Sequence, residues 1–238
     1  MKISPDSLVI FQSGWFKVNA TILFTWGIML LLTVASWLIT RRLRTGRSLS
    51  RWQNLLEVIV KGMRDQIHAV SRQDPGPYLP FVGSLFMFIG ASNLLIIVPG
   101  YEPPTGSLST TAGLAICVFI AVPLYGIAER GIAEYLKHYI KPTPFMLPFN
   151  IMGEASRTIA LAVRLFGNIM SGTMIVGILL SITPLIFPIV MQVLGLLTGI
   201  IQAYIFAILA MVYIASATKA HKEKLENKET EEKGGQHG

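Results

Sequence analysis

Charged residues are scarce in this sequence, at 14% of 238 residues, whereas hydrophobic residues make up 52%. Soluble domains carry about a quarter charged residues, so this composition excludes an ordinary soluble protein and indicates an integral membrane protein. Cys117 is the one cysteine, which excludes a disulfide within the chain and a cysteine-based metal site. The sequence also has no phosphate-binding glycine loop, no zinc motif and no nucleophile–base pair. We therefore expect no cofactor, no directly bound nucleotide and no active site of its own.

Acidic residues are missing from the long stretch between Glu154 and Glu223, and Arg164 lies within it. No charged residue of either sign follows Arg164 until Lys219, so this arginine begins a long uncharged run. We expect its guanidinium at the edge of a bilayer or inside it, where it stays protonated. An ionisable residue within a membrane is costly, and its default interpretation is an ion path or a relay. A cation path through this chain would need a carboxylate supplied largely by another chain.

Uncharged runs predict five membrane-spanning helices, since about 20 apolar residues cross a bilayer core. The predicted spans are 18–40, 78–100, 110–128, 145–182 and 188–218. Residues 50–72 combine basic residues with apolar ones at helical spacing, which predicts an amphipathic helix on the membrane surface. The expected fold class is an all-α integral membrane protein with one membrane domain, 1–218, and a polar cytoplasmic tail, 219–238. The composition of the tail predicts disorder or a fraying helix end.

Lysine and arginine are concentrated in alternate connections between these spans. Residues 41–78 hold eight of them, whereas 100–108 and 181–188 hold none. Because connections rich in lysine and arginine stay in the cytoplasm, we predict an outside N-terminus and a cytoplasmic C-terminus. The net charge of +7 lies mostly beside apolar spans, which favours the lipid bilayer over nucleic acid as a partner.

The fourth predicted span is longer than a bilayer requires. As one helix, 145–182 would be about 57 Å long, against a hydrocarbon core of about 30 Å. We therefore expect the last two helices to form a long, tilted hairpin that presents a sideways face to a partner.

Polar and small side chains share one predicted face of the fourth span: Arg157, Ala160, Arg164, Gly167, Asn168 and Ser171. Such a face suits close approach of another helix or a wet crevice. Arg157 could equally lie at the membrane boundary, with its side chain reaching the headgroups. In the last span, Gln202 either makes a hydrogen bond between helices or faces Arg164 and Asn168 across a hydrated path.

Three stretches carry a family resemblance: Arg164-Leu165-Phe166-Gly167-Asn168, then Gln202-Ala203-Tyr204-Ile205-Phe206 with Tyr213, and the loop 99–111. Together they resemble subunit a of the F-type ATP synthases, over about residues 20–218. The resemblance implies a bacterial inner-membrane stator subunit whose two ion half-channels meet the carboxylates of a rotating c-ring, and b-type stator subunits as further partners. It implies that Arg164 is the essential arginine, that Asn168 and Gln202 are its polar companions, and that Glu154 lies at the mouth of one half-channel.

Three positions depart from the pattern of that family. Thr173 stands where many members have glutamate, Gly195 where many have histidine or glutamate, and Ser107 where aspartate is common. An outer entrance lined by hydroxyls, including Ser171 and Thr173, could pass a proton through water or could pass sodium. The sequence is also similar to the alternate, sodium-linked branch of the family. The coupled ion is therefore expected to be the proton, with sodium as the alternative.

Two other classes of protein fit the composition. A secondary transporter or stand-alone channel would be expected to show inverted repeats and broken helices, and the chain shows no repeat. A structural scaffold of the membrane would have no use for Arg164.

Overall fold

The computed structural model describes residues 9–13, 16–41, 51–98, 101–132, 146–182 and 187–234. Its elements are two short strands, six α-helices and two 3-10 turns. In chain order they are β1 (Val9–Ser13), β2 (Phe16–Asn19), α1 (Ala20–Thr40), α2 (Arg51–Ser71), α3 (Leu79–Leu94), η2 (Leu95–Ile97), η3 (Pro104–Gly106), α4 (Leu108–Arg130), α6 (Met146–Ile182) and α7 (Phe187–Gly234).

Five of these helices are long and apolar enough to cross a membrane, which confirms the predicted class of all-α, multi-pass membrane protein. The candidate spans are Ala20–Ile39, Leu79–Ile97, Leu108–Glu129, Pro148–Ile182 and Ile189–Thr218. Only small fractions of these spans are buried within the chain, so most of their apolar surface faces lipid or partner proteins. The remaining helix, α2, lies where the sequence predicts the amphipathic helix.

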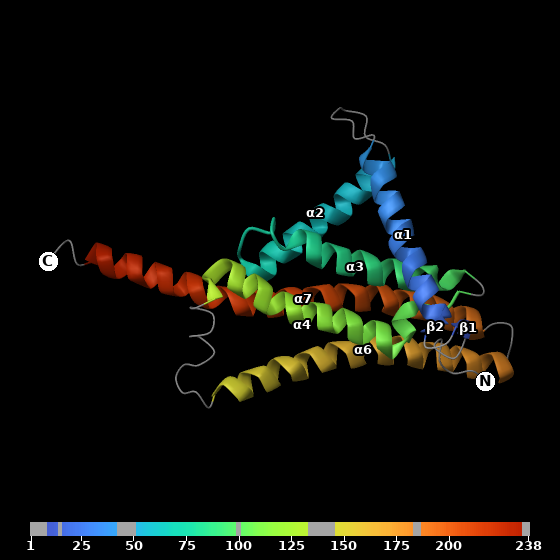
Figure 1. The fold of residues 1–238 in the computed structure, drawn as a ribbon. Coiled ribbons are helices and arrows are strands. Elements are labelled where there is room, and N and C mark those ends of the chain that lie inside the picture. The colour runs from blue at the N-terminus through green and yellow to red at the C-terminus, as the bar shows by residue number, and fades with distance from the viewer. Residues whose placement is uncertain are drawn as a thin grey trace.

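The long helices α3, α4, α6 and α7 run beside one another, and α1 crosses them steeply (Figure 1). The helix α2 descends from the far end of α1 to the start of α3. The end of α6, the start of α7, the end of α3, the start of α4 and the start of α1 lie at one end of this bundle (Figure 1).

Helix α7 lies at the centre and contacts α2, α3, α4 and α6. Its buried side chains include four alanines, Ala203, Ala207, Ala210 and Ala215, beside the larger Phe206. Small residues let two helix backbones approach closely, which is how membrane helices gain packing contacts when lipid removes the usual hydrophobic drive. Gly90 of α3 faces Ala203, where a Cβ on the glycine would lie 3.9 Å from that of the alanine.

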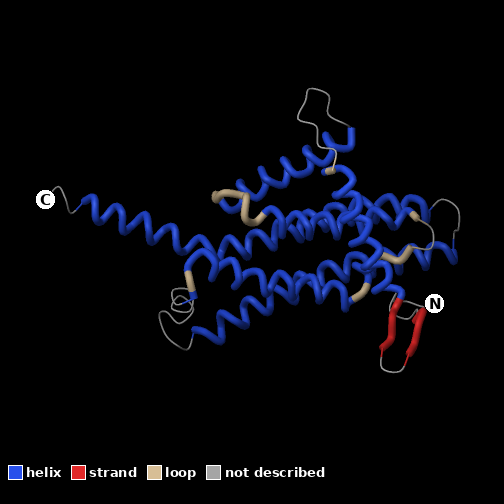
Figure 2. The backbone as a smooth tube through the Cα atoms, turned by 45° about the horizontal axis from the view of Figure 1, so that its top comes forward, coloured by secondary structure: helices blue, strands red, loops and turns tan. Residues whose placement is uncertain are grey.

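Two parts of the fold differ from what composition alone predicts. The two strands form an antiparallel hairpin before α1 (Figure 2), with Gln12 opposite Lys17. They lie in 1–17, a short segment with Pro5 and aromatic residues that the sequence predicts at the membrane interface. At the other end, α7 continues as a helix through the charged tail to Gly234. That tail is rich in lysine and glutamate, which are good helix formers, so a helix already started by the apolar span continues readily.

The sequence also predicts a solvated loop histidine at His138, because charged residues surround it, and a helix cap at Ser50. Both residues lie outside the described part of the chain, in 133–145 and 42–50. Helix α4 ends at Arg130, and the next residue, Gly131, has a φ of +78°, a conformation that glycine adopts without strain.

Candidate ion-translocation site

Helix α6 has one buried stripe and one exposed face. Leu161, Leu165 and Ile169 are buried against the other helices at four-residue spacing. Arg164 therefore projects away from that stripe, and its side chain is exposed. Among the residues that the structure describes, none forms a hydrogen bond or an ion pair with its guanidinium. A cation thus lies on the open face of a membrane-spanning helix, without a counter-charge from the part of its own chain that the structure describes.

The predicted polar face of α6 is open along its length. Arg157, Ala160 and Ser171 are exposed, like Arg164, and Gly167 and Asn168 are half-buried. Arg157 does have a neighbour, because its guanidinium carbon lies 5.8 Å from the centre of the Tyr213 ring, a cation–π contact.

A cavity of about 300 Å³ opens between α6 and α7 on one side of Arg164. Asn168, Ser171 and Thr173 line it from α6, and Gly195 and Thr198 line it from α7. The Asn168 amide donates to the Thr198 carbonyl at 3.5 Å, which joins the two helices there. The predicted hydroxyl-lined region is therefore hollow, and two of the three positions that depart from the family pattern border it.

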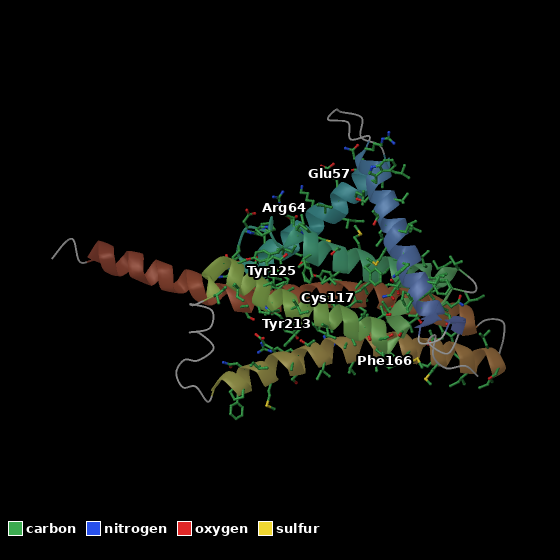
Figure 3. All side chains as sticks on the ribbon, viewed as in Figure 1. Glu57, Arg64, Cys117, Tyr125, Phe166 and Tyr213 are labelled. Atoms are coloured by element: carbon green, nitrogen blue, oxygen red, sulfur yellow. The ribbon has the colours of Figure 1, made fainter. Side chains whose placement is uncertain are left out.

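A much smaller cleft lies on the other side of Arg164, between α4, α6 and α7. Its polar lining includes Glu154, Arg157, Tyr213 and Ser216, and its volume of about 10 Å³ is room for about one water molecule. Tyr213 of α7 lies in the region between α4 and α6 (Figure 3). Because an α-helix rises 1.5 Å per residue, Glu154 is about 15 Å along α6 from Arg164, and Thr173 is about 14 Å away in the opposite direction.

Gln202 lies deep in the bundle, with 5% of its surface exposed. Its amide nitrogen is buried and has no hydrogen-bond partner among the described residues. An unpaired buried donor costs about 1–3 kcal/mol. Gln202 is therefore buried, whereas Arg164 is on the exposed face of α6. The hydrogen bond from Asn168 reaches α7 at Thr198, one turn before Gln202.

Sequence reasoning missed a second polar connection, around Asn93 of α3. The Asn93 amide donates to the Gly199 carbonyl of α7 at 2.9 Å, and its oxygen accepts from the Thr105 hydroxyl at 2.9 Å. Asn93 and Thr105 are fully buried. The available signal was a lone amide near the end of an apolar run, which must find a partner in a membrane, although nothing in the sequence says which one.

A polar cluster also joins four elements near the opposite ends of the helices. The Tyr78 hydroxyl lies 2.9 Å from Gln73 Oε1 and 3.0 Å from Glu129 Oε2, and the Thr218 hydroxyl lies 3.3 Å from the same glutamine oxygen. Two causes raise the pKa of Tyr78 to about 12: burial, which is the larger, and the nearby Glu129 carboxylate. This phenol therefore stays protonated.

These features define a class: a multi-pass membrane protein with a cation on the open face of a spanning helix and polar hollows on both sides of it. Within the described residues, no three His, Cys, Asp or Glu side chains come together as metal ligands. The family model described as the ATP synthase A chain matches residues 22–215. The chain therefore belongs to the ATP synthase A chain family.

Relatives with high identity agree with this family. "ATP synthase subunit a" of Albidiferax ferrireducens is 62% identical over 226 residues, which cover 95% of this chain and 98% of that protein. "ATP synthase subunit a 2" of Acaryochloris marina is 63% identical over 219 residues, or 92% of this chain and 94% of the relative. "ATP synthase subunit a 1" of Chlorobaculum parvum is 62% identical over 223 residues, covering 94% and 99% of the two chains.

Proposed function

We propose that Arg164 is the fixed cation at which this membrane subunit of an ATP synthase meets, one after another, the carboxylates of a rotating c-ring. The observation that carries the proposal is the exposure of Arg164 without a counter-charge from the described chain. A guanidinium in such a place needs an acceptor, and the sequence has no acidic residue between Glu154 and Glu223. A second subunit must then bring the carboxylate.

The electrostatics give Arg164 its role in ion transfer. Two unit charges 4 Å apart attract by about 4 kcal/mol at an effective dielectric constant of about 20. That energy corresponds to about three pKa units in favour of the ionised carboxylate. A ring carboxylate would therefore release its ion on reaching Arg164 and would bind an ion again after leaving it. The same fixed charge opposes the passage of free cations between the two sides.

The two hollows beside Arg164 supply the separate routes that such a mechanism needs. The cavity bordered by Asn168, Ser171 and Thr173 would serve the outer side, and the cleft at Glu154 and Arg157 would serve the cytoplasmic side. Each lies about 15 Å or less along α6 from Arg164, so ions reach the ring at different levels and the arginine separates them. In this proposal the coupled ion is the proton, and sodium is the alternative. Water bound by the hydroxyls and amides of the cavity could carry either ion.

The orientation follows from the positive-inside rule, with the N-terminus outside, the C-terminus in the cytoplasm and the chain in a bacterial inner membrane. The open face of α6 would lie against the ring. The b-type stator subunits would then bind elsewhere, and an apolar cavity of about 480 Å³ bordered by α1, α2, α3 and α7 is the surface that we expect them to cover.

The proposal is tested by replacing Arg164 in the whole ATP synthase reconstituted into liposomes. We expect Arg164→Ala to abolish ATP-driven ion uptake, because no cation remains to ionise the ring carboxylate, while the complex still assembles. Uptake is measured with a pH-sensitive dye and with sodium-22, and assembly is measured by co-purification of the ring.

The matched control is Arg64→Ala, which removes an exposed arginine from α2, on the side away from the long helices (Figure 3). This variant should transport normally. Coupled transport by an assembled Arg164→Ala complex would rule out the proposed role of the arginine.

A further inference from the structure

We propose that Glu102 is the cation-holding carboxylate of the outer route, where it binds the coupled ion between the outside solution and the cavity next to Arg164. This inference rests on the proposed function. It assigns an acidic site to a loop that connects α3 to α4 and that no mechanism described so far uses.

Glu102 lies in an unusually buried loop. The residues that follow it, Pro103 to Ser107, are buried, and the turn η3 within them contacts α1, α3, α4 and α6. Loops normally run over a protein surface, because their backbone groups need water. A loop held between four helices instead places its side chains inside the end of the bundle.

The carboxylate of Glu102 has an unsatisfied atom. Its Oε2 is buried and accepts no hydrogen bond from the described residues, and the same is true of the neighbouring Tyr101 hydroxyl. The Ser92 hydroxyl is near this tyrosine, but it donates its own proton to the Phe88 carbonyl at 2.7 Å. Buried polar atoms almost always have a partner. A carboxylate and a phenol on consecutive residues, each with a buried and unpartnered oxygen, are suited to a cation or to the water that carries it.

Tyr101 would assist Glu102 as a donor. Burial raises the pKa of Tyr101, so its hydroxyl remains protonated and can donate to a water or a carboxylate. Its ring is fixed by an edge-on contact with Phe24 of α1, with ring centres 5.2 Å apart. The donor is therefore held in place at the outer end of α1.

A series of polar groups leads inward from Thr105 in this loop, with one interruption between two neighbouring carbonyls of α7. The Thr105 hydroxyl donates to Asn93, and Asn93 donates to the Gly199 carbonyl. The next carbonyl along α7, that of Thr198, accepts from Asn168, which borders the 300 Å³ cavity and lies one turn from Arg164. The series joins the Glu102 loop to the open face of α6 through three helices.

Few acidic residues of the chain could be the cation-holding group of the outer route. Between Asp74 and Glu129, Glu102 is the sole acidic residue. The cavity itself is lined by amides, hydroxyls and apolar groups, without a carboxylate. A cation crossing from outside therefore meets one negative group of this connection before it reaches the ring, and that group is Glu102.

The test uses the whole ATP synthase in liposomes with three variants. We expect Glu102→Gln to lower ATP-driven ion transport about tenfold or more, since a positioned proton carrier contributes at least that much. Glu102→Asp should recover much of the rate, because it keeps the carboxylate. Glu57→Gln, which changes an exposed glutamate of α2, should transport like the parent.

A protonophore distinguishes the ion. Sodium-22 uptake that persists with the protonophore and is lost in Glu102→Gln would identify Glu102 as a sodium site, and protonophore-sensitive acidification lost in the same variant would identify a proton site. Parent-like transport by Glu102→Gln would overturn the inference, and so would equal loss in Glu102→Asp together with failed assembly, which would indicate a structural role. Either result leaves the Arg164→Ala test unaffected, so the two proposals fail separately.

Discussion

At the level of single residues, Gly199 sets how closely α3 can approach α7. A Cβ at this position would lie 2.8 Å from the Asn93 Cβ, a distance that real side chains do not adopt. The same close approach brings the Asn93 amide to the Gly199 carbonyl. Because glycine has no side chain, Gly199 makes room for the hydrogen bonds that connect the loop of Thr105, through Asn93, to α7 at the centre of the bundle.

We expect Gly199→Ala to destabilise the assembled subunit by about 1–3 kcal/mol, because overpacking forces two helices apart. The thermal midpoint of the detergent-solubilised complex should fall, and the yield of complex should fall with it. Gly83→Ala in α3 is the matched control, since a Cβ there meets nothing within 4 Å. Equal midpoints for the two variants would show that α3 and α7 can separate at no cost.

The candidate site was predictable in part, for reasons visible in particular residues. Arg164 stands out because it is charged within an apolar run, so its cost in a bilayer identifies it without any contact being known. Asn93 and Gly199 lie 106 residues apart, and only the rotation of two helices brings them together. The burial of Glu102 likewise depends on a loop folding inward, which no periodicity records.

At the level of elements, the Tyr78 hydroxyl ties the start of α3 to the end of α4, and Gln73 extends this connection to Thr218 of α7. The cluster lies at the opposite ends of α3 and α4 from the Glu102 loop. It fixes these ends by hydrogen bonds between side chains.

We expect Tyr78→Phe to lower the thermal midpoint of the complex near neutral pH, because Glu129 and Gln73 each lose a neighbour. Tyr125→Phe is the control, since that hydroxyl makes one exposed contact, at 3.3 Å to the Pro77 carbonyl. A midpoint for Tyr78→Phe that matches this control would show that the cluster adds no stability.

The raised pKa of Tyr78 gives the same variant a second signature. An unfolded tyrosine ionises near pH 10, whereas folded Tyr78 keeps its proton up to about pH 12. The unfolded chain thus binds fewer protons in this window, and stability falls as the pH rises from 10 to 12. The parent should lose more stability over that range than Tyr78→Phe does, as measured by denaturation at each pH.

The helices themselves were predictable, because each span is an uncharged run of sufficient length. Their ends were less so. Helix α7 runs on to Gly234, since the tail residues tolerate a helix that the apolar span has begun. The strands β1 and β2 pair across a two-residue connection in a segment whose composition gave only an interfacial location.

At the level of the whole molecule, the sequence alternates connections rich in lysine and arginine with connections that have neither, 100–108 and 181–188. We expect a cysteine at Ile182, which is 69% exposed, to react with a membrane-impermeant maleimide from the outside. A cysteine at Asp74 should react from the cytoplasmic side. Both are made in a Cys117→Ser background and are measured in right-side-out and inverted vesicles, and the reverse pattern would contradict the predicted orientation.

The exposure of Arg164 also bears on how the subunit is made. A newly inserted copy without its ring would turn a permanent cation toward acyl chains, at a cost of at least about 2.5 kcal/mol. Under the proposed function, such a copy would be unstable in the membrane until a ring carboxylate reaches Arg164. We therefore expect the ring to be assembled before this subunit joins it.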